Sequence, residues 1–213
     1  MPIHRLLGTC RDRIPAYASS AYLATPEDYV DKALGFRSKG WTAYKIHPHT
    51  VPKEDIEICQ VMRNAVGKDM VLMLDSMWSY TYEDALRVGR AIEALDYLWY
   101  EDPLAEDDIY NYVKLKSKLD IPIMSTEYAP GRLYGMAQWI QQGATDMLRG
   151  DVAVTGGVDH GKGLGRVSDQ IAGNVVGVER LDQHPDALFF HGPAAKIRLP
   201  MKVSRPPPRS PSS

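Results

Sequence analysis

Residues 70–76 read MVLMLDS, an apolar and β-prone run that closes on an acid, Asp75. Five further runs have the same strand character: IPAYAS (14–19), WTAYKIH (41–47), YLWYEDP (97–103), IPIMSTE (121–127) and TDMLRGDV (145–152). β-branched and aromatic residues favour strands, and short apolar runs bounded by turn residues are typical of a buried parallel sheet. The six runs therefore predict six strands.

Amphipathic helices are expected between these strands. The segments 54–66 and 83–96 each repeat apolar residues at helical spacing, which places them on one face. An earlier segment has a similar stripe, made by Tyr29, Ala33 and Phe36. Gly40 and Gly67 follow two of these segments, where a helix often ends on a residue with positive φ.

Strand and helix alternate with a repeat of about 26 residues. Such regularity predicts an α/β fold, namely an incomplete (β/α)8 TIM-type barrel with about six recognisable βα units. A doubly wound parallel sheet is the structural alternative. Its nucleotide-binding form would carry a Gly-rich phosphate loop after the first strand, and the sequence has none there.

The regular pattern ends near Gly157, which divides the chain into three parts. Residues 1–157 are expected to form the partial barrel. Residues 158–203 form an atypical, weakly structured continuation, and residues 204–213, SRPPPRSPSS, a disordered low-complexity tail. The abrupt change suggests a frameshifted or alternatively terminated product. The hypothesis predicts that further βα units are encoded in another reading frame of the gene.

The composition excludes several classes of protein. Hydrophobic residues make up 44% of the chain and charged residues 24%, as in soluble globular domains. A formal net charge of −2, with dispersed Lys and Arg, argues against a nucleic-acid partner. No apolar run approaches the roughly 20 residues that cross a bilayer, and the N-terminus does not resemble a signal peptide.

The two cysteines, Cys10 and Cys59, are far apart and lack the spacing of a zinc site or a disulfide framework. We therefore expect reduced thiols in a cytoplasmic protein. The sequence leaves homo-oligomerisation open.

Acids lie at the ends of four consecutive predicted strands, separated by 26, 26 and 24 residues: Asp75, Glu101, Glu127 and Asp151. Parallel strands of a barrel end at one mouth, where catalytic groups lie. Converging carboxylates repel one another unless a cation lies between them. Oxygen ligands favour a hard divalent ion, so Asp75, Glu101 and Glu127 predict a Mg²⁺ site.

Lys45 and His47 lie at the end of the second predicted strand. They are two residues apart, so both side chains should point to the same side of the sheet. Arg149 stands two residues before Asp151 and should share its side. For Arg149, a contact with substrate and an ion pair inside the barrel are both open.

The successive motifs AYKIH, LMLDS, WYEDPL, STEYAPG and DVAVTGGV resemble the strand ends of a known enzyme family. This family is the mandelate racemase/muconate lactonizing branch of the enolase superfamily, and the resemblance concerns its C-terminal barrel domain. It covers residues 14–158. The resemblance implies that Asp75, Glu101 and Glu127 bind Mg²⁺.

The resemblance also implies a chemistry. Members of the family remove a weakly acidic proton next to a carboxylate, and the metal stabilises the resulting enediolate. Lys45 and His47 fall on the family's Lys-x-Lys position, with His in place of the second Lys. His47 is then the base and Lys45 contacts the substrate carboxylate, although the two roles could be reversed. Asp151 matches the Asp that orients a His from the seventh strand.

The reaction itself is open, because His47 departs from the family pattern. The expected substrate is a small-molecule carboxylate, namely a sugar acid such as an aldonate or aldarate. The favoured reaction is its dehydration. The alternatives are a racemase, epimerase or cycloisomerase of the same superfamily, or a catalytically inactive truncated fragment. Because the first predicted strand lies near residue 14, we expect the family's N-terminal capping domain to be absent from this chain. Its seventh-strand His is also not identifiable, because His184 and His191 lack strand-end context.

Overall fold

The structure is a computed structural model that describes residues 16–151 and Arg5. In this part of the chain, six strands alternate with five helices. The strands are β1 (Ala18–Ser19), β2 (Ala43–Ile46), β3 (Val71–Asp75), β4 (Tyr100–Glu101), β5 (Ile123–Ser125) and β6 (Met147–Leu148). The helices are α2 (Pro26–Ser38), α3 (Pro52–Val66), α4 (Tyr82–Ala94), α5 (Ile109–Lys116) and α6 (Arg132–Gln141). The predicted continuation 158–203, the predicted tail 204–213 and Cys10 lie outside the described residues.

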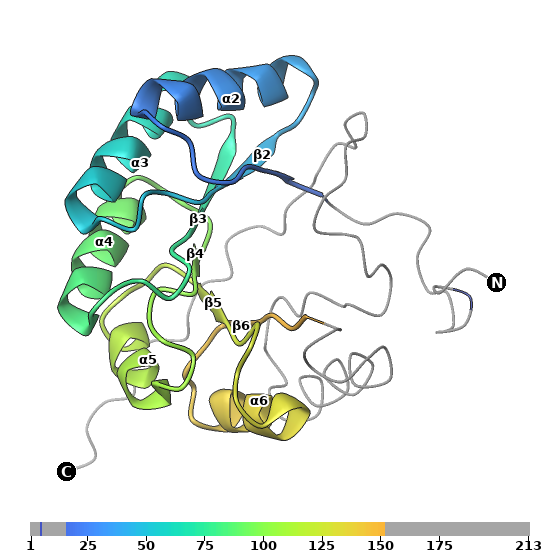
Figure 1. Ribbon diagram of the computed structural model, residues 1–213, viewed down its shortest axis with the longest axis vertical. Helices are drawn as coiled ribbons and strands as arrows, with labels where there is room; N and C mark the ends of the chain where they lie inside the picture. Colours follow the sequence, from blue (N-terminus) through green and yellow to red (C-terminus); the bar gives the residue numbers. More distant parts are fainter. Residues whose placement is uncertain (1–4, 6–15, 152–213) are drawn as a thin grey trace, which may run out of the picture.

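The strands follow chain order across one sheet, from β1 to β6, and every neighbouring pair is parallel. Figure 1 shows α2 to α6 following one another in an arc along one side of this sheet. A doubly wound sheet would place helices on both faces and reverse its strand order at a switch point. The structure therefore confirms the predicted barrel-type βα arrangement. Over the described residues it forms an open parallel sheet of six strands, which is an incomplete barrel.

Side chains alternate between the two faces of the strands, as the pleat requires. The face toward the helices holds the main core, which includes Tyr44, Leu72, Tyr100, Ile123 and Leu148. The inner face carries a smaller apolar cluster formed by Ala43, Met73, Trp99 and Met124. Lys45, Asp75 and Glu101 each stand two residues beyond a member of that cluster. They therefore belong to the inner face, at the carboxyl ends of the strands.

Local sequence explains where the helices begin and end. The Thr25 side chain accepts a hydrogen bond from the Asp28 backbone N–H at 3.2 Å, and the Asp28 carboxylate accepts one from the Thr25 N–H at 3.0 Å. This capping box starts α2. Gly40 and Gly67 end α2 and α3 with φ of 86° and 68°, as the sequence predicts.

The strands are shorter than the sequence runs suggest, at two to five residues each. β4 stops at Glu101 because the next residue, Asp102, has φ of 43°. β5 stops at Ser125 because Thr126 has φ of 90°. Positive φ breaks the extended backbone, so pairing ends at these two residues.

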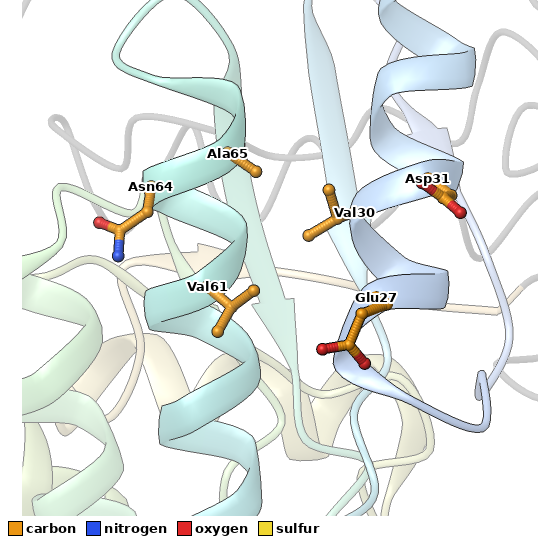
Figure 2. A pocket seen from close by; sticks show the side chains of 6 residues that line it. All are labelled: Glu27, Val30, Asp31, Val61, Asn64 and Ala65. Atoms are coloured by element: carbon orange, nitrogen blue, oxygen red, sulfur yellow. The ribbon is translucent and has the colours of Figure 1, made fainter.

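A groove lies in the helix layer, between α2 and α3 (Figure 2). Its lining residues are Glu27, Val30, Asp31, Val61, Asn64 and Ala65. None of them belongs to the charged group at the strand ends, so the chemistry predicted from the sequence lies elsewhere. In the part of the chain that the structure describes, no helix has the length and apolar character needed to span a membrane.

One buried acid belongs to the helix layer. Asp55, in the first turn of α3, is fully buried and accepts a hydrogen bond from the Tyr80 hydroxyl. Burial raises the pKa of Asp55 above its ordinary value, although the bond from Tyr80 opposes the shift. A carboxyl whose pKa is raised by folding stabilises the fold at acid pH, and that stability is lost as pH rises through the folded pKa.

Asp55→Asn should therefore gain stability relative to the wild type as pH rises above about 4, the ordinary range of a carboxyl group. The neutral amide has no ionisation to oppose, while the weaker bond from Tyr80 limits the gain to about 1 kcal/mol. Urea unfolding at several pH values measures the difference. The exposed Asp69→Asn control should stay within about 0.5 kcal/mol of the wild type throughout. A pH-independent difference for Asp55→Asn would contradict the argument.

Candidate metal and acid–base site

Lys45 lies among the acids at the carboxyl ends of β2 to β4. Its side chain is 2% exposed, and Nζ donates to Asp75 Oδ2 at 3.1 Å and to Glu101 Oε1 at 2.7 Å. Burial alone would lower the pKa of Lys45, but the carboxylates of Glu101 and Asp75 raise it above its ordinary value. Lys45 is therefore a buried cation shared by two acids.

His47 follows β2 on the same side as Lys45. Its Nδ1 lies 2.6 Å from the carbonyl oxygen of Ser20, and its Nε2 lies 3.1 Å from Asp75 Oδ2. A carbonyl oxygen can only accept, so Nδ1 must carry the proton of that bond. Nε2 is then the ring nitrogen that faces the acids. Both Lys45 and His47 thus meet the same oxygen of Asp75, as their spacing in the strand predicts.

Three carboxylates form a close group. Asp75, Glu101 and Asp102 are all buried, and each offers an oxygen within 4.8 Å of the other two. Neighbouring donors hold two of them in place. Asp75 Oδ1 accepts from the backbone N–H of Met77 at 3.1 Å, and Glu101 Oε2 accepts from Trp99 Nε1 at 3.0 Å.

Asp102 joins this group through its backbone conformation. Strict alternation would turn its side chain away from that of Glu101, but the positive φ of Asp102 departs from strand geometry. Within residues 16–151, neither carboxylate oxygen of Asp102 has a hydrogen-bond partner, and both are buried. Buried oxygens without a donor are suited to a hard divalent cation, so the residues present fit the Mg²⁺ that the sequence predicts.

Glu127 is linked to the other acids by Arg149, which directly follows the neighbouring strand β6. The Arg149 guanidinium donates from Nη2 to Glu127 Oε1 at 2.7 Å and from Nη1 to Glu101 Oε1 at 2.6 Å. Glu127 lies outside the close group of three described above. Of the three ligands proposed from the sequence, Asp75 and Glu101 therefore lie together, and Glu127 is joined to them by a cation.

The pKa values show how the charges compete. Burial alone would raise the pKa of Asp75, but the charges of Lys45, His47 and Arg149 outweigh it and lower that pKa well below its ordinary value. Burial raises the pKa of Glu101, with Lys45 opposing. Burial likewise raises the pKa of Glu127 to about 7, against the attraction of Arg149.

Asp102 is also disfavoured from ionising by its surroundings. Burial raises its pKa well above the ordinary value, and the like charges of Glu101 and Asp75 add to the shift. If Asp75, Glu101, Asp102 and Glu127 all ionise, their negative charge exceeds the positive charge of Lys45 and Arg149. A divalent cation would relieve that excess.

Asp151 lies three residues beyond the end of β6, and its N–H donates to the Glu127 carbonyl oxygen at 3.5 Å. Its expected partner, a His from a seventh strand, lies outside the described residues. His184 and His191 also lie outside them. Asp102 and Trp99 were not predicted from the sequence as site residues. The signal for Asp102 is the pair of adjacent acids in the motif YEDP, although alternation along a regular strand would turn its side chain to the opposite face.

The fold and the site together define a class of protein: a parallel βα barrel wall with buried acids and two candidate acid–base groups at its carboxyl end. The chain belongs to the enolase C-terminal domain-like family, whose model it matches over residues 28–171, more than half of its length. This match confirms the resemblance drawn from the strand-end motifs.

Curated relatives include hydro-lyases and isomerases. The chain is 28% identical over 171 residues to an arabinonate dehydratase of Saccharolobus solfataricus, an alignment that covers 78% of this chain and 46% of the relative. It is 31% identical to a D-galactarolactone cycloisomerase of Agrobacterium fabrum, covering 70% of this chain and 40% of the relative. The chain thus spans less than half the length of these relatives.

A solved structure has the same arrangement. The D-glucarate dehydratase from Agrobacterium tumefaciens, complexed with magnesium, superimposes with a TM-score of 0.76 at 34% sequence identity. The superposition covers 79% of this chain and 48% of the dehydratase.

Proposed function

We propose that this chain carries the barrel part of a Mg²⁺-dependent enzyme that removes the proton α to a carboxylate. Among such reactions we favour dehydration of a sugar acid, an aldonate or aldarate. The observation that carries the proposal is the buried group of Asp75, Glu101 and Asp102 with Lys45 and His47 at its side. The relatives named above, a dehydratase and a cycloisomerase, support it.

Asp75, Glu101 and Glu127 are the proposed metal ligands, and Asp102 is placed to join them. Mg²⁺ bound there would supply Lewis-acid stabilisation of the negative charge that develops on the substrate. Lys45 would add a second positive charge next to the substrate carboxylate. Its buried position keeps that charge in a medium of low dielectric constant, where it acts more strongly than in water.

His47 would take the α proton at Nε2. The bond from Nδ1 to the Ser20 carbonyl orients the ring with Nε2 toward the site, and Nε2 must give up the proton that it shares with Asp75 Oδ2 before it can act as a base. In a dehydration, the C–H electron pair forms the enediolate, and the hydroxyl on the next carbon then leaves as water after protonation. Asp151 is proposed to orient the partner His that would serve as the second acid–base group.

The test is α-proton exchange in D₂O. The full chain would be incubated with MgCl₂ and a panel of aldonates and aldarates, and each acid followed by proton NMR and mass spectrometry. We expect Mg²⁺-dependent loss of the α proton from at least one acid, seen as deuterium at the α carbon of the recovered acid or, for a dehydratase, as a 2-keto acid with deuterium at C3, and loss of either signal after EDTA. Neither exchange nor product across the panel, from a folded sample that binds Mg²⁺, would instead support a catalytically inactive fragment.

The products separate the alternatives. A dehydratase would also release a 2-keto acid, detected as its semicarbazone. A racemase or epimerase would give exchange with inversion at the α carbon, and a cycloisomerase would give a product of unchanged mass. The cytoplasmic location and homo-oligomerisation stay predictions.

A further inference from the structure

Arg149 lies close to several carboxylates at once, whereas an ordinary ion pair joins one cation to one acid. Its side chain is 11% exposed, and Nη1 lies 2.6 Å from Glu101 Oε1 and 3.6 Å from both Asp75 Oδ2 and Asp102 Oδ2. Nη2 lies 2.7 Å from Glu127 Oε1. One guanidinium therefore touches or approaches all four carboxylates of the site.

The balance of charge around this guanidinium is uneven. Four carboxylates face two buried cations, Arg149 and Lys45. If every acid ionises, the group carries a net charge of −2, which one divalent cation would neutralise. Without Arg149 the excess would be larger, and a metal ion would meet less competition for the same oxygens.

The geometry also separates Glu127 from the other acids. Asp75, Glu101 and Asp102 each have a carboxylate oxygen close to the other two. Glu127 lies outside this group and pairs with Arg149 Nη2. The Thr126 side chain strengthens this link, because its Oγ1 donates to the Arg149 carbonyl oxygen at 2.7 Å and accepts from the Arg149 N–H at 3.2 Å. Glu127 and Arg149 are thus held side by side across β5 and β6.

We propose that Arg149 is a positioning residue: a tethered cation that competes with the metal for the acids and holds Glu127, which can ligate only after Arg149 releases it. The inference rests on the metal site of the proposed function. Arg149 should lower the affinity for the metal, because a unit charge a few ångströms from a divalent ion repels it. In return it keeps the acids compensated before the metal binds.

Mg²⁺ titration by calorimetry tests this inference on the full chain. Arg149→Gln should lower the Kd for Mg²⁺ by about tenfold or more. Arg149→Lys keeps the charge and should stay within about threefold of the wild type. Lys116→Gln is the matched control, because it also removes a paired cation, the partner of Asp146 at 2.9 Å, far from these acids. It should leave the Kd unchanged.

Thermal unfolding gives a second readout that does not depend on activity. Arg149→Gln should melt at a lower temperature than the wild type in EDTA, and should gain more from saturating Mg²⁺. An unchanged or weaker Mg²⁺ affinity of Arg149→Gln would overturn the inference, since Arg149 would then support the ligands rather than compete for them.

If Arg149→Gln alone does not fold, a second pair of variants tests the same inference. Glu127→Gln/Arg149→Gln removes one anion and one cation, so the charge of the group is unchanged. It should bind Mg²⁺ several-fold more tightly than Glu127→Gln alone; equal or weaker binding would overturn the inference. A folded wild type that binds no Mg²⁺ would overturn the proposed function as well, whereas a wild type that binds it leaves only the role of Arg149 in question.

Discussion

Replacing Glu101 by Gln should weaken Mg²⁺ binding by at least about 100-fold and abolish α-proton exchange. Glu101 lies at the centre of the site, because its Oε1 accepts from both Lys45 and Arg149 at 2.7 and 2.6 Å. Gln has nearly the same shape but no charge. The substitution removes the anion that a divalent cation needs, and it leaves the two buried cations without their shared partner.

Stability should fall together with affinity. Breaking a buried ion pair by removing one partner costs about 3–5 kcal/mol, because the remaining charge stays buried. Calorimetric Mg²⁺ titration and urea unfolding in EDTA measure the two effects separately. Glu83→Gln, on the exposed face of α4, is the matched control and should change neither. A Glu101→Gln variant that bound Mg²⁺ like the wild type would remove Glu101 from the ligand set.

The repeat in the sequence predicts the fold because barrel geometry is itself repetitive. Each βα unit buries one strand and the inner stripe of one helix, so the same pattern of apolar residues returns about every 26 residues. The helix stripe at Tyr29, Ala33 and Phe36 is buried against the sheet as the pattern indicates. What the repeat cannot predict is where each strand stops pairing, because that depends on single backbone angles.

Those backbone angles also decide which acids meet. The two-residue alternation correctly puts Lys45, in β2, and His47, directly after it, on the same side. It fails for Asp102, whose positive φ redirects the side chain. A lone Asp tolerates such a conformation better than most residues, yet nothing in the motif YEDP requires it.

Arg149 shows a second limit of sequence reasoning. Its place directly after β6, two residues before Asp151, predicts an inward side chain. The structure shows the ion pairs of Arg149, which the sequence could not distinguish from a substrate contact. The choice depends on how far a long side chain extends toward acids on three other strands. The spacing of residues along one strand does not predict which of these acids the Arg149 side chain can contact.

Replacing His47 by Asn should lower the rate of α-proton exchange by about 10²- to 10⁴-fold, the usual contribution of a general base. Asn can still donate to the Ser20 carbonyl from its amide, so the bond that His47 Nδ1 makes at 2.6 Å is retained. What it loses is Nε2, the nitrogen that faces Asp75. Mg²⁺ affinity should therefore stay within about threefold of the wild type, which separates loss of the base from loss of the metal.

His49→Asn provides the matched control for this experiment. His49 contacts the Leu23 carbonyl oxygen at 2.7 Å and Glu54 Oε2 at 3.1 Å, outside the acidic group, so exchange should change less than about threefold. Exchange at the wild-type rate in His47→Asn would reverse the two roles and make Lys45 the base. Lys45 would then have to lose its proton while held between Asp75 and Glu101. Because both acids raise its pKa, the arrangement favours His47.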